Sequence, residues 1–157
     1  MSQSNDLANR FREVTLNGTW IANTNLKALI HDINLKDATK KNDQLNTIAQ
    51  LTFHLGYYIS GVLQVLEGGT LDIKDQYSFD MPALVTENDW KKLRYKVLSD
   101  AEQFARRVSA LSEHQLKQIF VDKKYGSYKR NIEGVIEHCY YHLGQISLIK
   151  KMNESNI

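Results

Sequence analysis

The chain has little of three things: it has one cysteine (Cys139), one proline (Pro82) and no run of 18 apolar residues. A single cysteine excludes an internal disulfide and every metal site built from several cysteines. The missing apolar run argues against a membrane-spanning helix. The first residues also lack the basic and apolar blocks of a signal peptide. These absences predict a cytoplasmic protein that does not partner a membrane.

An excess of charge of one sign is also missing. Lys and Arg number 20 and Asp and Glu number 18, which gives a formal net charge of +2. A nucleic-acid partner is therefore not expected, because binding to phosphates needs a basic stripe. Hydrophobic residues make up 42% of the chain and charged residues 24%, as in an average folded protein. With 157 residues, we expect a single domain, 1–157, with a sizeable core.

Long stretches without proline favour helices, because proline is the strongest helix breaker. Apolar residues recur at spacings of three and four, the pattern of amphipathic helices, in four segments at about 7–30, 45–66, 87–110 and 131–152. Thr86 is placed to cap the third helix. Ser112 to Gln115 form a capping box that predicts a further short helical turn.

Two connections between these helices are long. The segment 68–85 is expected to form an ordered crossover, and 119–130 a short β-hairpin around Lys124-Tyr125-Gly126-Ser127, before the last helix. Four amphipathic helices with two longer connections predict an all-α four-helix bundle. Glycines inside the predicted helices are either tolerated weaknesses or points of close helix approach, at positions 56, 61, 134 and 144.

Three histidines suggest a metal site. His138 and His142 are four residues apart, so they share one face of the last helix. His54 lies in a stripe with Leu51 and Tyr58 on the second helix, so it is placed to point inward as well. Neutral imidazole binds Zn, Ni, Fe or Cu, and three protein ligands with an open position are typical of a catalytic metal site.

The spacing alone leaves a second interpretation open. An H-x-x-x-H pair arises often by chance, and this one lacks the glutamate of the H-E-x-x-H metalloprotease motif. The histidines would then be half-buried and bonded to the backbone or to tyrosine. Gln145, three residues past His142, either orients a ligand or makes a hydrogen bond between packed helices.

The remaining candidates are not assigned to the metal. Cys139 lies about 100° around the helix from His138, so we expect it to miss the site and to act as a small buried hydrophobe. His31 lies at the end of the first predicted helix, and His114 lies within the capping box.

Two stretches around the histidines resemble the DinB/YfiT-like superfamily of bacterial metalloenzymes. They are Leu51-Thr52-Phe53-His54-Leu55 and the run from Glu137 to Ile146, EHCYYHLGQI, which contains that family's H-x-x-x-H-x-G-Q-I signature. The resemblance covers nearly the whole chain in order. Other segments resemble a subgroup found in Bacteroidetes-type bacteria, namely Phe11 to Val14, Trp20 to Asn23 and Tyr57 to Leu63.

This resemblance implies an up-up-down-down four-helix bundle, often a homodimer, with a metal held by three histidines. These histidines correspond here to His54, His138 and His142. Relatives in the family include bacillithiol and mycothiol S-transferases and a thiol-dependent isomerase. Their shared chemistry is that the metal binds a low-molecular-weight thiol and stabilises its thiolate, which is the nucleophile.

The resemblance therefore implies one divalent transition metal (Zn, Ni or Fe), a low-molecular-weight thiol as co-substrate, and S-transferase-like chemistry on a small-molecule substrate. Two alternatives remain open. The metal could activate water for hydrolysis, or the chain could be a non-catalytic helical protein that binds metal or a partner. No residue is assigned a catalytic role beyond the three metal ligands.

Overall fold

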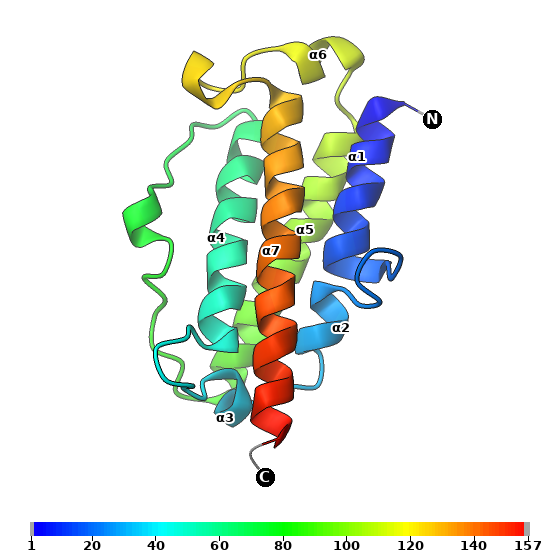
Figure 1. Cartoon of the computed structure of the whole chain (residues 1–157). Coiled ribbons are helices and arrows are strands. Elements are labelled where there is room, and N and C mark those ends of the chain that lie inside the picture. Colours follow the sequence, from blue (N-terminus) through cyan, green and yellow to red (C-terminus); the bar gives the residue numbers. More distant parts are fainter. Residues whose placement is uncertain (1, 156–157) are drawn as a thin grey trace.

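The computed structural model describes residues 2–155, and within them it contains helices and no strand. Figure 1 shows four long helices side by side: α1 (Gln3–Arg12), α4 (Ile48–Leu66), α5 (Glu87–Ser109) and α7 (Tyr128–Ser155). The shorter helices are η1 (Glu13–Asn17), α2 (Leu26–Ile30), α3 (Leu35–Ala38), η2 (Asp75–Tyr77), α6 (Glu113–Lys117) and η3 (Lys123–Tyr125). No helix in the described part of the chain is long and apolar enough to span a membrane.

The direction of the long helices differs from the expected up-up-down-down order. In Figure 1, α1 and α7 run downward and α4 and α5 run upward. An up-up-down-down bundle needs two long crossover connections. Here α2 and α3 stay at the lower end of the bundle and α6 stays at the upper end, so neither connection returns along it. The segment 67–86 does run the length of the bundle, beside α4.

The first predicted helix, 7–30, is broken in the structure. Beyond α1 the backbone widens into the π-helical turn η1 and then becomes extended at Gly18. Asn23 has a positive φ of 55°, and the Asn25 side chain accepts the Ala28 N–H to begin α2. Asparagine side chains offer the backbone such local alternatives to a continuous helix. The apolar spacing was misleading here, since Ile21 is 64% exposed.

The starts of the other helices mostly follow their sequence signals. Capping boxes are present at Thr86 for α5 and at Ser112 for α6, which confirms both predictions. The expected hairpin is reduced to one antiparallel bridge, between Ile119 and Ser127. Asp122 accepts the Lys124 N–H and thereby caps η3, so a helical turn fills the place of a β-turn.

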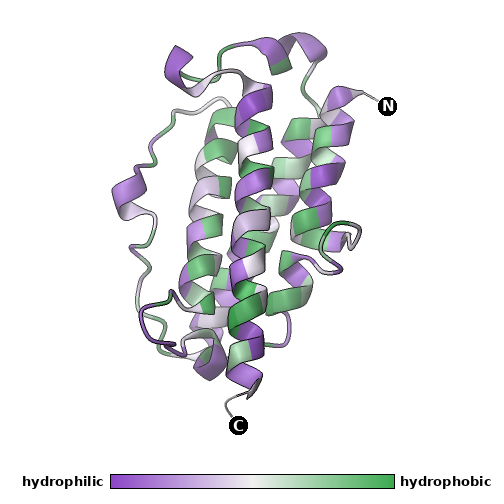
Figure 2. Cartoon of the chain, in the orientation of Figure 1, coloured by the Kyte–Doolittle hydropathy of each residue, from purple (hydrophilic) through white to green (hydrophobic). Residues whose placement is uncertain are grey.

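The core lies between the four long helices. Figure 2 shows hydrophobic residues gathered on the sides of the helices that face one another. Trp90, Phe11 and Phe104 are fully buried, and the rings of the two phenylalanines lie 4.4 Å apart between centroids. This contact joins α1 to α5. The helix α4 packs against both α5 and α7.

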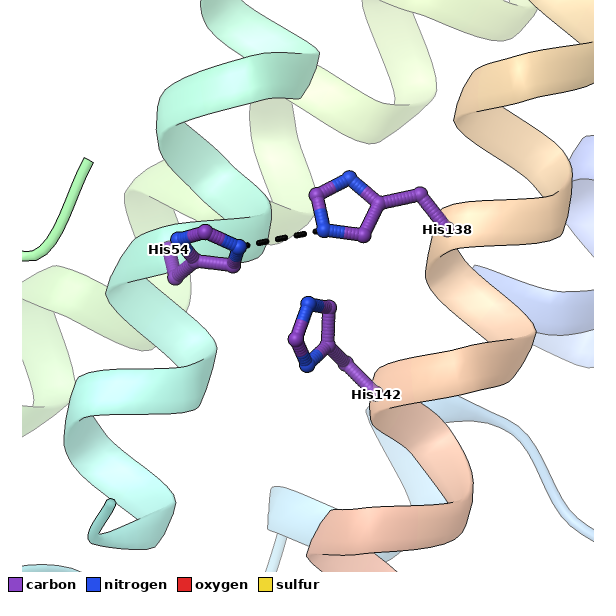
Figure 3. Close-up of side chains that lie close together, drawn as sticks. All are labelled: His54, His138 and His142. Carbon is purple, nitrogen blue, oxygen red and sulfur yellow. Dashed lines mark hydrogen bonds between the residues drawn. The ribbon is translucent and has the colours of Figure 1, made fainter. Parts of the chain in front are cut away.

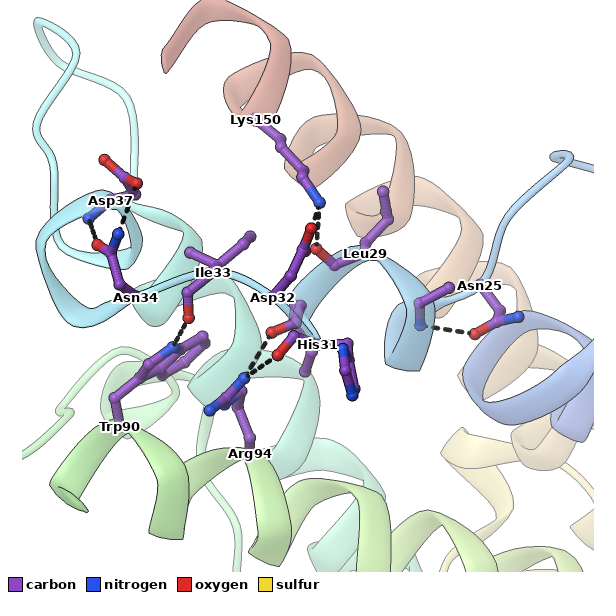
Figure 4. A network of polar contacts seen from close by, with 12 residues as sticks. Asn25, Leu29, His31, Asp32, Ile33, Asn34, Asp37, Trp90, Arg94 and Lys150 are labelled. Atoms are coloured by element: carbon purple, nitrogen blue, oxygen red, sulfur yellow. Dashed lines mark hydrogen bonds and ion pairs between the residues drawn. The ribbon is translucent and has the colours of Figure 1, made fainter. Parts of the chain in front are cut away.

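A polar network at the lower end of the bundle fixes the segment that joins α1 to α4 (Figure 4). Arg94 donates from Nη1 to the carbonyls of Ile30, at 2.9 Å, and His31. Lys150 donates to the Leu29 carbonyl at 3.1 Å, and its ammonium lies 2.8 Å from Asp32. Cations from α5 and α7 thus satisfy the free carbonyls at the end of α2, which is too short to be stable alone.

Two helical glycines are expected to respond oppositely to alanine. A Cβ at Gly56 would lie 2.5 Å from Val97 Cγ2, on α5, whereas a Cβ at Gly144 would meet nothing within 4 Å. Because valine is stiff at χ1, Gly56→Ala should lower the free energy of unfolding by about 1–2 kcal/mol. Gly144→Ala should raise it by about 0.5–1 kcal/mol. Urea unfolding followed by circular dichroism checks both, and a shift of both variants in the same direction would contradict this packing.

Candidate metal centre

His54 on α4 and His138 and His142 on α7 point toward one another between these two helices (Figure 3). One ring nitrogen of each histidine lies within 4.8 Å of the corresponding nitrogens of the other two. The Nε2 atoms of His54 and His138 are 3.1 Å apart. His54 and His142 are buried and His138 is half-buried. The structure thus brings together the three histidines singled out in the sequence, across the contact between α4 and α7.

The outer nitrogens of two of these rings are held by oxygen atoms. His54 donates from Nδ1 to the Ser78 carbonyl at 3.3 Å, and His142 donates from Nδ1 to Gln145 Oε1 at 2.6 Å. Because both oxygens are acceptors, each neutral ring carries its proton on Nδ1 and has a lone pair on Nε2. Outer partners of this kind orient imidazole ligands in metal sites.

The cluster favours the neutral form of each histidine. Burial lowers the pKa of His54 and of His142, and the positive charge that His142 can carry lowers that of His54 further. The pKa of His138 falls to about 4, first because of burial and then because of its two histidine neighbours. Three rings that are neutral at pH 7 can donate lone pairs to a metal without first losing a proton.

Side chains from the crossover and α4 surround the cluster. The Phe79 ring stacks on His54, with 4.0 Å between centroids. Tyr58 presents its ring edge-on to His54 and His138, at 5.1 and 4.9 Å, and its hydroxyl donates to Asp75 Oδ1 at 2.7 Å. Burial and the Asp75 carboxylate raise the pKa of Tyr58, so the phenol stays protonated at neutral pH.

A cavity of about 410 Å³ opens beside His138. We call it the side cavity. Its walls come from α4, the crossover, the segment 120–125 and the first turns of α7. Tyr58, Asp75 and His138 line the cavity at the end that meets the histidine cluster. A small molecule bound at this end of the side cavity would therefore contact His138 directly.

The other sequence candidates lie outside the cluster, as expected. Cys139 is buried, and burial raises the pKa of its thiol to about 12, so this thiol is not a nucleophile. His31 and His114 are exposed. Gln145 contacts His142, which supports the interpretation that it orients a ligand. Ser78, Phe79 and Asp75 were missed, because no periodicity marks a crossover residue as part of a site.

Gln145 gives a direct test of the orienting contact. Gln145→Leu should weaken metal binding by about 10–100-fold, because His142 loses the acceptor that fixes its ring and its tautomer. Gln145→Glu keeps an oxygen acceptor and should retain most of the affinity. Competition with a chromophoric chelator measures both constants. Equal affinity of the wild-type chain and Gln145→Leu would mean that the contact is only helix packing.

Comparison with known proteins gives one match. The family model described as the DinB superfamily matches residues 21–146. This range includes His54, His138, His142 and the crossover. No curated protein and no solved structure matches the chain.

Proposed function

Because this chain belongs to the DinB superfamily, we propose that it is a metal-dependent enzyme that catalyses a thiol-dependent transfer on a small molecule. His54, His138 and His142 would hold one divalent transition metal. The observation that carries the proposal is the convergence of three ring nitrogens within 4.8 Å of one another. The thiol chemistry is supported by the family resemblance and by the side cavity at His138.

The chemistry of the three histidines supports this assignment to a metal ion. The Nδ1 proton of His54 is engaged by Ser78, which leaves the lone pair of Nε2 facing His138 Nε2 at 3.1 Å. Three inward nitrogens without a carboxylate or a thiolate favour Zn, Ni or Fe over Mg or Ca. A divalent ion held there would supply a positive charge that favours the deprotonated form of a nearby thiol.

Side chains next to the three histidines would position the substrate and accept its proton. The Phe79 ring covers one face of His54, and the Tyr58 ring lies edge-on to His138. The Tyr58 hydroxyl already donates to Asp75, so its oxygen retains lone pairs that can accept a hydrogen bond from a substrate in the side cavity. In the transfer, the thiol sulfur forms a bond to an electrophilic carbon and the leaving group departs with its electron pair. The thiol proton passes toward the Tyr58–Asp75 pair and then to solvent.

The experiment combines a thiol with an electrophile such as 1-chloro-2,4-dinitrobenzene. The dinitrophenyl thioether should form faster than in the uncatalysed reaction only when metal-loaded protein and thiol are both present. It should fall to background with chelator or in His138→Ala. Metal-dependent hydrolysis of an ester without thiol would instead favour the hydrolase. Absence of any metal-dependent turnover with either reagent class would contradict the proposed enzyme.

A further inference from the structure

The side cavity follows one face of α7. Arg130, Gly134, His138 and His142 are spaced by four residues along this helix, so each lies about one turn further along α7 and about 40° further around it than the one before. The first three of them line the side cavity, and the last two belong to the histidine cluster. A molecule that lies along this face from His138 would reach Gly134 and then the Arg130 side chain.

The Arg130 guanidinium lies beside Gly134. A Cβ added at Gly134 would be 4.0 Å from Arg130 Nη1. The same nitrogen donates to both carboxylate oxygens of Glu137, at 3.3 and 3.1 Å, which holds the side chain along the helix axis. Gly134 precedes His138 by one turn, or about 6 Å of rise. The cation is therefore held about one helical turn from the cluster.

Positively and negatively charged side chains line different parts of the side cavity. Its positively charged residues are Lys124 and Arg130. Its carboxylate belongs to Asp75, on the wall where Tyr58 and His138 meet. Glu137 occupies Nη1 of Arg130, but a guanidinium has five N–H donors, so others remain for a ligand. A carboxylate or another anion matches this planar group better than a neutral polar group does.

The segment that carries Lys124 is fixed by hydrogen bonds. Asn131 donates from Nδ2 to the carbonyls of Tyr125 and Ser127, both at 2.8 Å. The Phe120 N–H donates to the Gly126 carbonyl at 3.0 Å. The Lys124 ammonium lies 4.9 Å from the centroid of the Tyr125 ring. This wall is thus preorganised, as a binding site requires.

Gly134 keeps the cavity open along α7. Glycine inside a helix costs about 0.5–1 kcal/mol relative to alanine, yet no close neighbour forbids a side chain here, since the nearest atom to an added Cβ is 4.0 Å away. The space beside Gly134 belongs to the side cavity instead. The missing side chain leaves room for a ligand between the Arg130 guanidinium and His138.

We propose that the side cavity selects a substrate with an anionic group about one helical turn from its reacting atom, bound by Arg130 and Lys124. This inference rests on the proposed function, in which the reacting atom is the thiol sulfur. The substrate class is then a small thiol that also carries a carboxylate or a similar anion.

The test compares 3-mercaptopropionate with its neutral analogue 3-mercapto-1-propanol, by calorimetric titration of zinc-loaded protein. The wild-type chain should bind the anionic thiol roughly tenfold more tightly. The double variant Lys124→Gln/Arg130→Gln should bring the ratio close to one without changing the affinity for the neutral thiol. Lys123→Gln, an exposed neighbour that does not line the cavity, should keep the wild-type ratio. A ratio of one in the wild-type chain, or an unchanged ratio in the double variant, overturns the inference.

A second pair of variants tests the cavity itself. Gly134→Leu should weaken binding of both thiols by roughly tenfold or more, because the side chain fills the space, while zinc stoichiometry stays the same. Gly144→Leu, on the same helix with open space around it, should bind both thiols normally. Unchanged binding to Gly134→Leu would place the ligand elsewhere and overturn the inference.

Propionate, which has no sulfur, separates this inference from the proposed function. If propionate binds in a way that depends on Arg130 and Lys124 while neither thiol binds more tightly than its sulfur-free analogue, the anion site stands and the thiol chemistry fails. If both thiols bind equally and more tightly than propionate and 1-propanol, the thiol chemistry stands and the anion site fails.

Discussion

Replacing His138 with alanine is expected to lower metal affinity by a hundredfold or more. His138 Nε2 lies 3.1 Å from His54 Nε2, so its loss leaves two ligands of the three. Removal of a residue that only orients a ligand already costs about 10–100-fold, and removal of the ligand itself should cost more. We expect His54→Ala and His142→Ala to have effects of similar size, because all three ring nitrogens belong to one cluster.

Elemental analysis of protein purified without a histidine tag measures this effect. The wild-type chain should retain about one metal ion per chain through gel filtration, and each of the three alanine variants should retain close to none. His114→Ala is the matched control, because His114 is exposed and lies outside the cluster. An unchanged metal content in the three variants would show that the ion binds elsewhere.

Metal binding should also raise the stability of the folded chain by about 4 kcal/mol at a free metal concentration a thousand times the dissociation constant. At this chain length, the gain corresponds to roughly 10 °C in Tm. It arises because the ion binds three nitrogens that converge only in the folded state. Thermal unfolding with excess zinc and with chelator measures the gain, and His138→Ala should show none of it. A gain of equal size in that variant would contradict the site.

The pH dependence of metal binding has a definite sign. The folded-state pKa of His138 is about 4, below its ordinary 6.5, so the metal-free folded chain resists protonation that the unfolded chain accepts. The neutral His138 ring therefore contributes to the free energy of unfolding in full above pH 6.5, and this contribution is lost as the pH falls through about 4. Metal should therefore stay bound below pH 6.5, where protons already compete with a metal for an ordinary imidazole. Half-release close to pH 6.5 would contradict the lowered pKa.

Much of the helical structure follows from local signals in the sequence. The start of α5 was predictable because Thr86 forms a capping box whose partners are three residues apart. The break after η1 was not, because apolar spacing continues through Ile21, although this side chain is exposed. The direction of the helices depends on where α2, α3 and α6 lie, and helix periodicity carries no information about that.

The histidine cluster was partly predictable from the sequence alone. The four-residue spacing of His138 and His142 places both on one helix face, but the meeting with His54 is a tertiary contact. The resemblance to a family supplied that link. Ser78 could not have been predicted from the sequence, because it binds His54 through the main-chain carbonyl of Ser78. Every residue has such a carbonyl, so the residue type carries no signal. Phe79 and Asp75 lie on a crossover, where position along the chain does not determine which way a side chain faces.

Anomalous scattering from a crystal, recorded on both sides of the absorption edges of Zn, Ni and Fe, tests the metal centre most directly, since it reports place and element together. The proposed function predicts one strong peak at about 2.0–2.1 Å from a ring nitrogen of each of His54, His138 and His142. A metal-soaked crystal with no peak among these rings, or with its peak on other side chains, would contradict it.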